Sequence, residues 1–251
     1  MVGKKTGIAW CDHTFNPWIG CQKVSAGCQN CYAERLNKRY HWIKGEWGSG
    51  YARTSVTNWQ KPLSWAAEAA KAGVIRRVFC SSLADVFDEN VRPSWRVSLF
   101  KLILETLKFG SLEWLILTKR PENIPHAQIP WEPLVESGLV RIGISAESQH
   151  TLDDRLQKLA WYSPLPNFVS IEPMLQEITL RDQHIDWVIC GSESGPGARA
   201  FDIAWARSLA NQCDYRGIPF FLKQMPVGGK LVENPVLDYR QYLEFPKRHG
   251  E

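Results

Sequence analysis

The sequence lacks any long apolar run, and none of its segments approaches the roughly 18 apolar residues that a membrane-crossing helix needs. Its start is basic, but Asp12, His13, Asn16 and Pro17 stand where a signal peptide would have its apolar core. We therefore expect a cytoplasmic protein with no membrane partner.

The chain also lacks a large excess of charge of one sign, an internal repeat and any low-complexity tract. With 30 Lys and Arg against 26 Asp and Glu, its net charge is only +4. Such a mild charge permits a nucleic-acid partner without requiring one. Most of the 12 tryptophans are expected to pack in the core, although aromatic faces also bind bases.

A disulfide framework is not expected either. The number of cysteines is odd, at seven, and disulfides are rare in a reducing compartment. A folded chain of 251 residues buries roughly 70–75% of its unfolded surface and needs no covalent staples. The cysteines are therefore available for metal binding or catalysis.

What the sequence does contain is a series of short β-branched or apolar runs, each followed by a turn and then by a helix-like stretch or long loop. This order is typical of βα units and a parallel sheet. We predict an α/β fold, a single partial or complete (β/α) TIM-type barrel, with a doubly wound open sheet as the alternative. The runs cover residues 77–81, 114–118, 140–145, 168–171, 187–190 and 220–222, with a seventh near 14–19.

The expected organisation is a barrel domain over residues 1–225 and a C-terminal extension, 226–251, packed on it. Segment 44–61, which contains glycines among aromatic residues, is expected to be a long loop that could act as a lid. Helical periodicity is clearest where Val97, Phe100, Leu104 and Leu107 recur on one face. The predicted helices cover residues 32–40, 95–108, 153–159 and 204–215.

Polar side chains follow the predicted strands. In α/β barrels the carboxyl ends of the strands form the active-site face, so these residues should converge on one basin. The alternative is that strand ends are polar only because they meet solvent. The residues are Ser82, Asp85, Lys119, Arg120, Glu147, Glu172, Ser192, Glu193, Ser194, Lys223 and Gln224.

Cys21, Cys28 and Cys31 lie within eleven residues, after the predicted first strand. Thiolates are preferred ligands of zinc and of iron–sulfur clusters. Three cysteines leave one iron of a four-iron cluster open, whereas structural zinc normally has four closed ligands. The alternative is a zinc site completed by Cys11, Asp12 or His13.

The other three cysteines occur in apolar strand or helix contexts, so we expect Cys80, Cys190 and Cys213 to be core residues rather than ligands.

The segment with the pattern N-P-W-x-G-C-x6-C-x2-C-Y-A, which contains these three cysteines, resembles the signature of a phage and prophage three-cysteine-motif family regarded as radical S-adenosylmethionine-like. The similarity covers most of the chain, from about Ile8 to Gln224. The matching stretches are residues 14–21, 24–28, 31–34, 117–121, 143–147, 169–173, 191–199 and 219–224.

The resemblance implies a partial radical-SAM-like barrel with a [4Fe-4S] cluster on Cys21, Cys28 and Cys31, and S-adenosylmethionine on the open iron. It further implies a 5′-deoxyadenosyl radical, an electron donor of flavodoxin or ferredoxin type and, for a phage-encoded chain, the host cytoplasm. The chain departs from the usual radical-enzyme motif in its six-residue first gap and in Asn30 before the last cysteine. Tyr32 is then the candidate for the aromatic contact to adenine.

On this interpretation, S-adenosylmethionine is bound by residues following the strands. The expected cofactor-binding residues are Tyr32, Ser82, Asp85, Glu147, Glu193 and Ser194. Cationic side chains would clamp anionic substrate groups, and the expected catalytic residues are Lys119, Arg120, Glu172 and Lys223.

The basic strand ends, the mild positive charge and the aromatic loop, together with the phage setting that the resemblance implies, favour a nucleotide or nucleobase in DNA that is modified or rearranged by radical chemistry. An amino acid or peptide substrate is left open. Two other classes of function remain as alternatives: a zinc-stabilised nucleic-acid-binding module, and a metal-dependent hydrolase that uses Glu147, Glu172 and Glu193.

Overall fold

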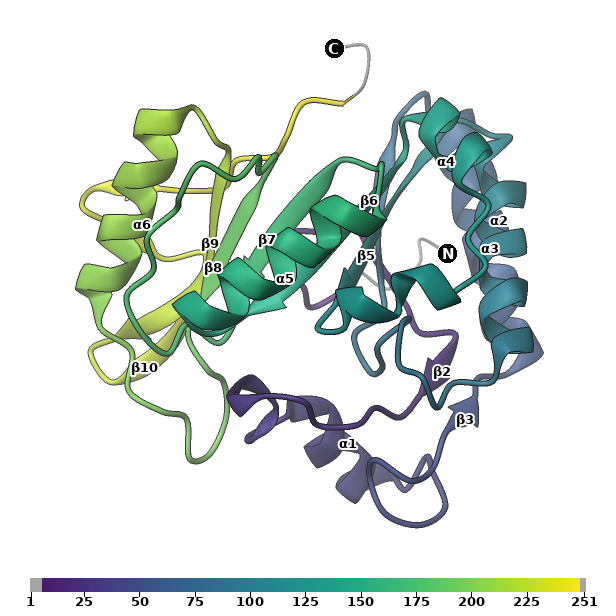
Figure 1. Ribbon diagram of the computed structural model, residues 1–251, viewed down its shortest axis with the longest axis horizontal. Helices are drawn as coiled ribbons and strands as arrows, with labels where there is room; N and C mark the ends of the chain where they lie inside the picture. Colours follow the sequence, from purple (N-terminus) through teal and green to yellow (C-terminus); the bar gives the residue numbers. More distant parts are fainter. Residues whose placement is uncertain (1–5, 249–251) are drawn as a thin grey trace.

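The computed structural model describes residues 6–248 and contains one eight-stranded sheet (Figure 1). Neighbouring strands are parallel from β1 to β9, and β10 pairs with β9 in the antiparallel direction. In sheet order the strands are β1 (His13–Phe15), β4 (Arg76–Cys80), β5 (Leu112–Thr118), β6 (Val140–Ala146), β7 (Asn167–Ile171), β8 (Val188–Gly191), β9 (Phe220–Val227) and β10 (Lys230–Glu233).

The helices that connect these strands lie along the outer face of the curved sheet, and α1 lies apart from them at its lower end (Figure 1). Within the described residues, no helix has the length and apolar character to span a membrane. The helices are α1 (Tyr32–Tyr40), α2 (Val56–Lys71), α3 (Pro93–Leu107), α4 (Trp131–Ser137), α5 (Gln149–Tyr162) and α6 (Ile203–Arg216), with 3-10 turns η1 (Ala26–Cys28) and η2 (Pro121–His126).

The sheet is curled but not closed, because β1 and β10 are its two edges. The predicted α/β class and TIM-type architecture are confirmed in the partial form, an open half-barrel. A doubly wound sheet would carry helices on both faces, whereas here they cover the outer face (Figure 1).

All six main predicted strands are present, and the seventh is divided. Residues 14–19 contain the end of β1 and then β2 (Trp18–Ile19), which pairs with β3 (Ala52–Arg53) in a separate small sheet. The prediction of one long loop over 44–61 is wrong in its second half, which contains β3 and the start of α2. Pro62 lies inside α2 and hid the helical pattern, although Ser55 accepts an N-cap bond from Asn58 N–H.

The helix predicted over 95–108 is present as α3, but its buried face is shifted from the predicted one. Leu99, Phe100 and Ile103 are fully buried, while Val97 and Leu104 are only half-buried. The three cysteines expected in the core, Cys80, Cys190 and Cys213, are buried as predicted.

The concave side of the sheet carries an aromatic cluster whose centre is Trp10, Phe168 and Trp187. Gly143 on β6 leaves room for it, because a Cβ at that position would come within 2.6 Å of the Phe168 ring. Trp10 and Phe79 also line the cavity described below, so this cluster forms part of the cavity wall.

The predicted boundary between barrel and extension, at residue 226, falls within β9, and β10 continues the same sheet. Beyond β10 the chain returns to the sheet: Leu222 N–H donates to the Tyr242 carbonyl at 2.9 Å, and Trp187 Nε1 donates to the Glu244 carbonyl at 2.9 Å. The first five and last three residues of the two predicted segments lie outside the described residues.

Candidate functional site

A cavity of about 610 Å³ lies where the carboxyl ends of the parallel strands meet the cysteine-containing loop. It brings together the residues predicted from the sequence, with the exception of Glu147. The predicted residues that line it are Cys21, Cys28, Cys31, Tyr32, Ser82, Asp85, Lys119, Arg120, Glu172, Glu193, Ser194 and Lys223.

The three cysteines reach this cavity from one short loop, residues 20–31, which we call the cysteine loop. Cys28 ends the 3-10 turn η1, and its N–H donates to the Ser25 carbonyl at 2.9 Å. Cys31 is the N-cap of α1. Among residues 6–248, no three or more His, Cys, Asp or Glu side chains are gathered in a ready-made metal site, so the thiols share a cavity without being drawn together.

The environments of two of these thiols differ. Burial, assisted by the nearby Asp85, raises the pKa of the Cys21 thiol to about 12. Burial also opposes ionisation of Cys28, but the positive charge of Lys119 and hydrogen bonds from Val24 and Ser25 outweigh it and hold the Cys28 pKa below its ordinary value. Lys119 therefore favours the thiolate form at Cys28.

Arg120 is the main anchor on one side of the cysteine loop. Its guanidinium, only 4% exposed, forms ion pairs with Asp85 at 3.0 Å and with Asp88 at 3.4 Å. It also donates to the Gln22 carbonyl at 2.6 Å and lies 3.6 Å from the Cys21 Sγ. Arg120 thus holds the first cysteine in place, rather than pointing free into the cavity.

Asp85 is engaged in the same network. Its carboxylate accepts hydrogen bonds from the Thr118 hydroxyl at 2.7 Å and from the Lys119 N–H at 2.9 Å, besides the ion pair with Arg120. Asp88, fully buried, accepts from the Gln22 N–H and from the Tyr51 hydroxyl, each at 2.9 Å. The two aspartates fix the strand ends and the cysteine loop relative to each other.

Glu193 is the anchor on the other side of the cysteine loop. Its carboxylate accepts from Asn30 Nδ2 at 2.9 Å and from Arg199 Nε at 3.0 Å, and Arg199 also donates to the Ala26 carbonyl at 2.9 Å. Burial would raise the pKa of Glu193, but the hydrogen bonds from Arg199 and Asn30 lower it to about 2. The ionised carboxylate thus ties the loop after β8 to the cysteine loop.

Further contacts hold Ser82 and Ser194 at the cavity wall through backbone atoms. Tyr32 donates its hydroxyl to the Ser82 carbonyl, and Arg35 Nη2 donates to the Ser194 carbonyl at 2.9 Å. Gly195 has a φ of +89°, and a Cβ there would come within 2.0 Å of Arg35. Glycine at this position allows α1 to approach the loop after β8.

Glu172 directly follows β7, whereas Lys223, which was predicted to follow its strand, lies within the longer β9. Lys223 Nζ lies 2.7 Å from Glu172 Oε1, and the Ser170 hydroxyl donates to Glu172 Oε2 at 2.9 Å. Lys119 differs from Lys223, because among the described residues its ammonium has no ion-pair partner. It is the cation in the cavity that is available to a ligand.

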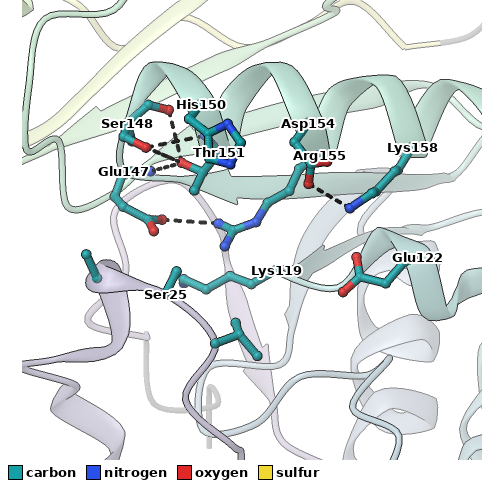
Figure 2. Close-up of a pocket in the computed structure, with 12 residues that line it drawn as sticks. Ser25, Lys119, Glu122, Glu147, Ser148, His150, Thr151, Asp154, Arg155 and Lys158 are labelled. Atoms are coloured by element: carbon teal, nitrogen blue, oxygen red, sulfur yellow. Dashed lines mark hydrogen bonds and ion pairs between the residues drawn. The ribbon is translucent and has the colours of Figure 1, made fainter.

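Glu147 lies in a second, smaller cavity of about 380 Å³, beside the N-terminal end of α5 (Figure 2). Its Oε2 pairs with Arg155 at 3.1 Å, and Arg155 also donates to the Ser145 carbonyl at 2.6 Å. The other oxygen, Oε1, is buried without a hydrogen-bond partner. A Cβ on Gly27 would come within 3.0 Å of Glu147 Oε2, so this carboxylate packs directly against the cysteine loop.

The sequence interpretation missed four residues of this arrangement: Asn30, Asp88, Arg155 and Arg199. Asp88 and Arg155 lie three and eight residues beyond the strand-end positions Asp85 and Glu147, so a reading restricted to strand ends does not include them. Arg199 is the last residue of the matching stretch 191–199, which was the only signal for it. Asn30 was noted only as a departure from a motif.

The chemistry of the cavity fits the implied cluster. It offers three thiols from one loop, a cation next to one of them, and serine and carboxylate groups at the opposite strand ends. Thiolates are the ligands that iron–sulfur clusters require.

The fold and the cavity together define an open parallel (β/α) half-barrel protein with a cysteine-lined site at the carboxyl ends of its strands. The chain belongs to the family described as "Protein of unknown function (DUF5131)", whose model matches residues 5–237. This description states no activity, and the resemblance to the three-cysteine-motif signature stays a prediction.

No curated protein matches the chain in sequence. Two solved structures are distantly similar, and both are variants of spore photoproduct lyase. A cysteine-to-serine variant has 14% identity and a TM-score of 0.48, and the match covers 89% of this chain and 68% of that one. A tyrosine-to-phenylalanine variant has 13% identity and a TM-score of 0.44, with 86% and 65% covered.

Proposed function

We propose that this protein is a radical S-adenosylmethionine enzyme that holds a [4Fe-4S] cluster on Cys21, Cys28 and Cys31 and acts on a nucleotide or nucleobase in DNA. The observation that carries the proposal is the shared cavity: the three thiols line it together with polar groups that follow β4, β5, β7 and β8 and with Lys223 of β9. When bound, the cluster and S-adenosylmethionine supply a 5′-deoxyadenosyl radical that takes a hydrogen atom from the substrate, with the electron coming from a flavodoxin- or ferredoxin-type donor.

The chain's own residues have distinct tasks in this proposal. Arg120 and Glu193 position the cysteine loop from its two sides. Ser82, Ser194 and Tyr32 line the space that S-adenosylmethionine would occupy next to the thiols. The protein's contribution to such chemistry is to bind and orient the reactants and to exclude water and other hydrogen donors. The Trp10 and Phe79 side chains, which line the cavity, would exclude them.

The substrate class follows from the remaining groups of the cavity. Lys119 lines the cavity and has no ion-pair partner among the described residues, and a second cation of the cavity, Lys223, is held by Glu172 at 2.7 Å. Apolar and aromatic walls, including Trp47, accompany them. A flat base with a nearby phosphate combines the two features that such a cavity accepts, since cations and aromatic faces both bind nucleotides.

The zinc alternative requires a fourth ligand near the three cysteines, and its three candidates are engaged elsewhere. The Cys11 thiol contacts the Ile8 carbonyl at 3.6 Å, Asp12 accepts from the Arg77 N–H at 2.7 Å, and the His13 ring stacks on Trp65 at 4.3 Å. None of the three lines the cavity, which favours the cluster over a closed zinc site.

The hydrolase alternative requires carboxylates that are free to bind a metal ion or activate water. Glu147, Glu172 and Glu193 are instead paired with Arg155, Lys223 and Arg199 respectively. Glu147 also lies in the separate smaller cavity. This pairing favours structural and positioning roles for the three groups.

The test is anaerobic purification followed by iron analysis, an absorption spectrum before and after dithionite, and an assay for 5′-deoxyadenosine with added S-adenosylmethionine. We expect about four irons per chain, bleaching on reduction, and release of 5′-deoxyadenosine. Cys21→Ser should lose the iron, whereas Cys11→Ser, a matched control outside the cavity, should retain it.

The proposal would be contradicted if the protein is colourless and holds one zinc ion after anaerobic reconstitution, and if Cys11→Ser and Cys21→Ser lose bound metal equally. That result would support the zinc-stabilised module. Turnover of a substrate in air without S-adenosylmethionine would support the hydrolase.

A further inference from the structure

We propose that the exposed surface at the C-terminal end of α1 binds a single-stranded segment of nucleic acid beside the cavity. We call this surface the α1 platform, and it consists of Lys38, Arg39, Tyr40, His41, Trp42 and Lys44. The inference rests on the proposed action on DNA and deepens it by naming the form in which the substrate is held.

Two aromatic rings of the platform are exposed and already stacked. The centroids of the Tyr40 and Trp42 rings lie 5.1 Å apart with an interplanar angle of 21°, and the residues are 51% and 37% exposed. The Arg39 guanidinium lies 5.3 Å from the Tyr40 ring centroid. Bases of a single strand stack on aromatic side chains and on arginine in this manner.

The turn that presents these rings is held by a buried polar residue. His41 ends α1 in the left-handed conformation, at φ 51°, and its N–H donates to the Asn37 carbonyl at 2.7 Å. The Asn37 side-chain oxygen then accepts from the Ile43 N–H at 3.0 Å, and Asn37 and Ile43 are both buried. The backbone is therefore held on both sides of the exposed Trp42, at His41 and at Ile43, so the position of this residue is set in advance of binding.

The charge of this segment suits a polyanion. The platform carries three cations, Lys38, Arg39 and Lys44, besides His41, and the chain has no acidic side chain between Glu34 and Glu46. The acidic residue just before them, Glu34, is already paired with Lys23 at 2.6 Å and Lys38 at 3.0 Å. Arg39 and Lys44 are exposed and have no ion-pair partner among the residues that the structure describes.

The platform and the cavity are two ends of one element. α1 starts directly after Cys31, and its residues Tyr32, Ala33 and Leu36 line the cavity. Nine helical residues span about 13 Å, which is the length of a few nucleotides. The chain beyond the platform returns to the cavity at Trp47, and α1 lies clear of the helices that cover the sheet (Figure 1).

A single strand fits this surface better than a duplex does. The faces of bases in a duplex are covered by their neighbours, so an exposed ring pair has nothing to stack against, whereas unpaired bases offer both faces. A nucleotide that is already unpaired also enters a cavity without the cost of unstacking.

The experiment measures fluorescence anisotropy of a labelled twelve-nucleotide oligothymidine with the full chain purified without oxygen. Trp42→Ala should weaken binding by at least about five-fold, as expected for the loss of one base–aromatic stack. The matched control is Trp161→Ala, because Trp161 is 66% exposed and contacts its neighbour Tyr162 edge-on on α5, far along the chain from the platform. Arg39→Ala should reduce the slope of log affinity against log salt.

Three results would overturn the platform. The first is a wild-type chain that does not bind the oligothymidine, and the second is a wild-type chain that binds a duplex of the same length more tightly. The third is an equal loss of affinity in Trp42→Ala and Trp161→Ala. Circular dichroism of each variant establishes that it is folded. Anisotropy does not require turnover, so this result is independent of 5′-deoxyadenosine formation. A chain that binds through Trp42 but releases no 5′-deoxyadenosine refutes the radical chemistry alone. A chain that releases 5′-deoxyadenosine but does not bind through Trp42 refutes the platform alone.

Discussion

Around the cysteine loop, the residues predicted to act on ligands divide into those that hold the loop and those that are free to bind. Arg120 pairs with Asp85 and donates to the Gln22 carbonyl of the loop, and Glu193 accepts from the Asn30 side chain. Lys119 and the thiols of the three cysteines remain open to the cavity. A buried charge is tolerated only when it is paired and hydrogen-bonded, and this requirement explains why strand-end charges serve as anchors here.

Replacement of Arg120 by methionine should be strongly destabilising. It would leave Asp85 and Asp88 buried without their cation, and removal of one partner of a buried pair costs roughly 3–5 kcal/mol. Urea unfolding followed by circular dichroism measures the free energy of unfolding. The matched control is Arg207→Met, since Arg207 pairs with Asp238 on the exposed surface, and it should leave the urea midpoint nearly unchanged.

Equal midpoints for the two arginine variants would mean that the buried network adds no stability. In that case the contact of Arg120 with Cys21 would be its only role.

The strands, as elements, determine which side chains meet. Because β4 to β9 are parallel and adjacent in the sheet, the residues that follow them reach one edge, as the sequence pattern predicted. Packing on the concave side depends on particular side chains, because the Phe168 ring occupies space that Gly143 on the neighbouring strand β6 leaves open.

Gly143→Ala on β6 tests this packing. Its Cβ would come within 2.6 Å of the Phe168 ring, and overpacking of a core costs typically about 1–3 kcal/mol. Thermal and urea unfolding should both report the loss. The control is Gly7→Ala, because a Cβ on Gly7 meets nothing within 4 Å; a Gly143 variant as stable as that control would show that β6 and β7 can separate without cost.

At the scale of the whole molecule, the contact of Glu193 with Asn30 connects two parts of the chain that are 163 residues apart in sequence. Arg199, six residues after Glu193, makes a second such connection through the Ala26 carbonyl. Together with Arg120, they fasten the cysteine loop and α1 to the open end of the half-barrel. The stability of the molecule should therefore depend on the ionisation of Glu193.

The pH dependence has a defined sign. The pKa of Glu193 is lowered from the ordinary value of 4.5 to about 2, so its ionisation favours the folded state. That contribution is complete above pH 4.5 and is lost as the pH falls through about 2. The free energy of unfolding, measured in urea from pH 6 to 2, should decline over this window, and Glu193→Gln should make the decline shallower. A parallel decline in the variant would assign the acid sensitivity to other groups.

The sequence by itself determined the α/β class, six of the parallel strands, and the convergence of Lys119, Glu172 and Lys223 on one cavity with the cysteines. These features depend on short-range periodicity and on the geometric rule that parallel strands end at one edge. The same information could not reveal the start of α2, because Pro62 interrupts the local pattern, or the two-residue β3, which is defined by its pairing with β2 more than thirty residues earlier.

Only the tertiary structure decided which of these polar groups are already used. Arg120 is engaged by Asp88, Glu193 by Arg199, and Glu147 by Arg155 in a separate cavity. Burial and pairing depend on partners that are distant along the chain or on a neighbouring turn of helix. For that reason, the division between residues that hold the cysteine loop and residues that are free to bind emerges only when the chain is folded.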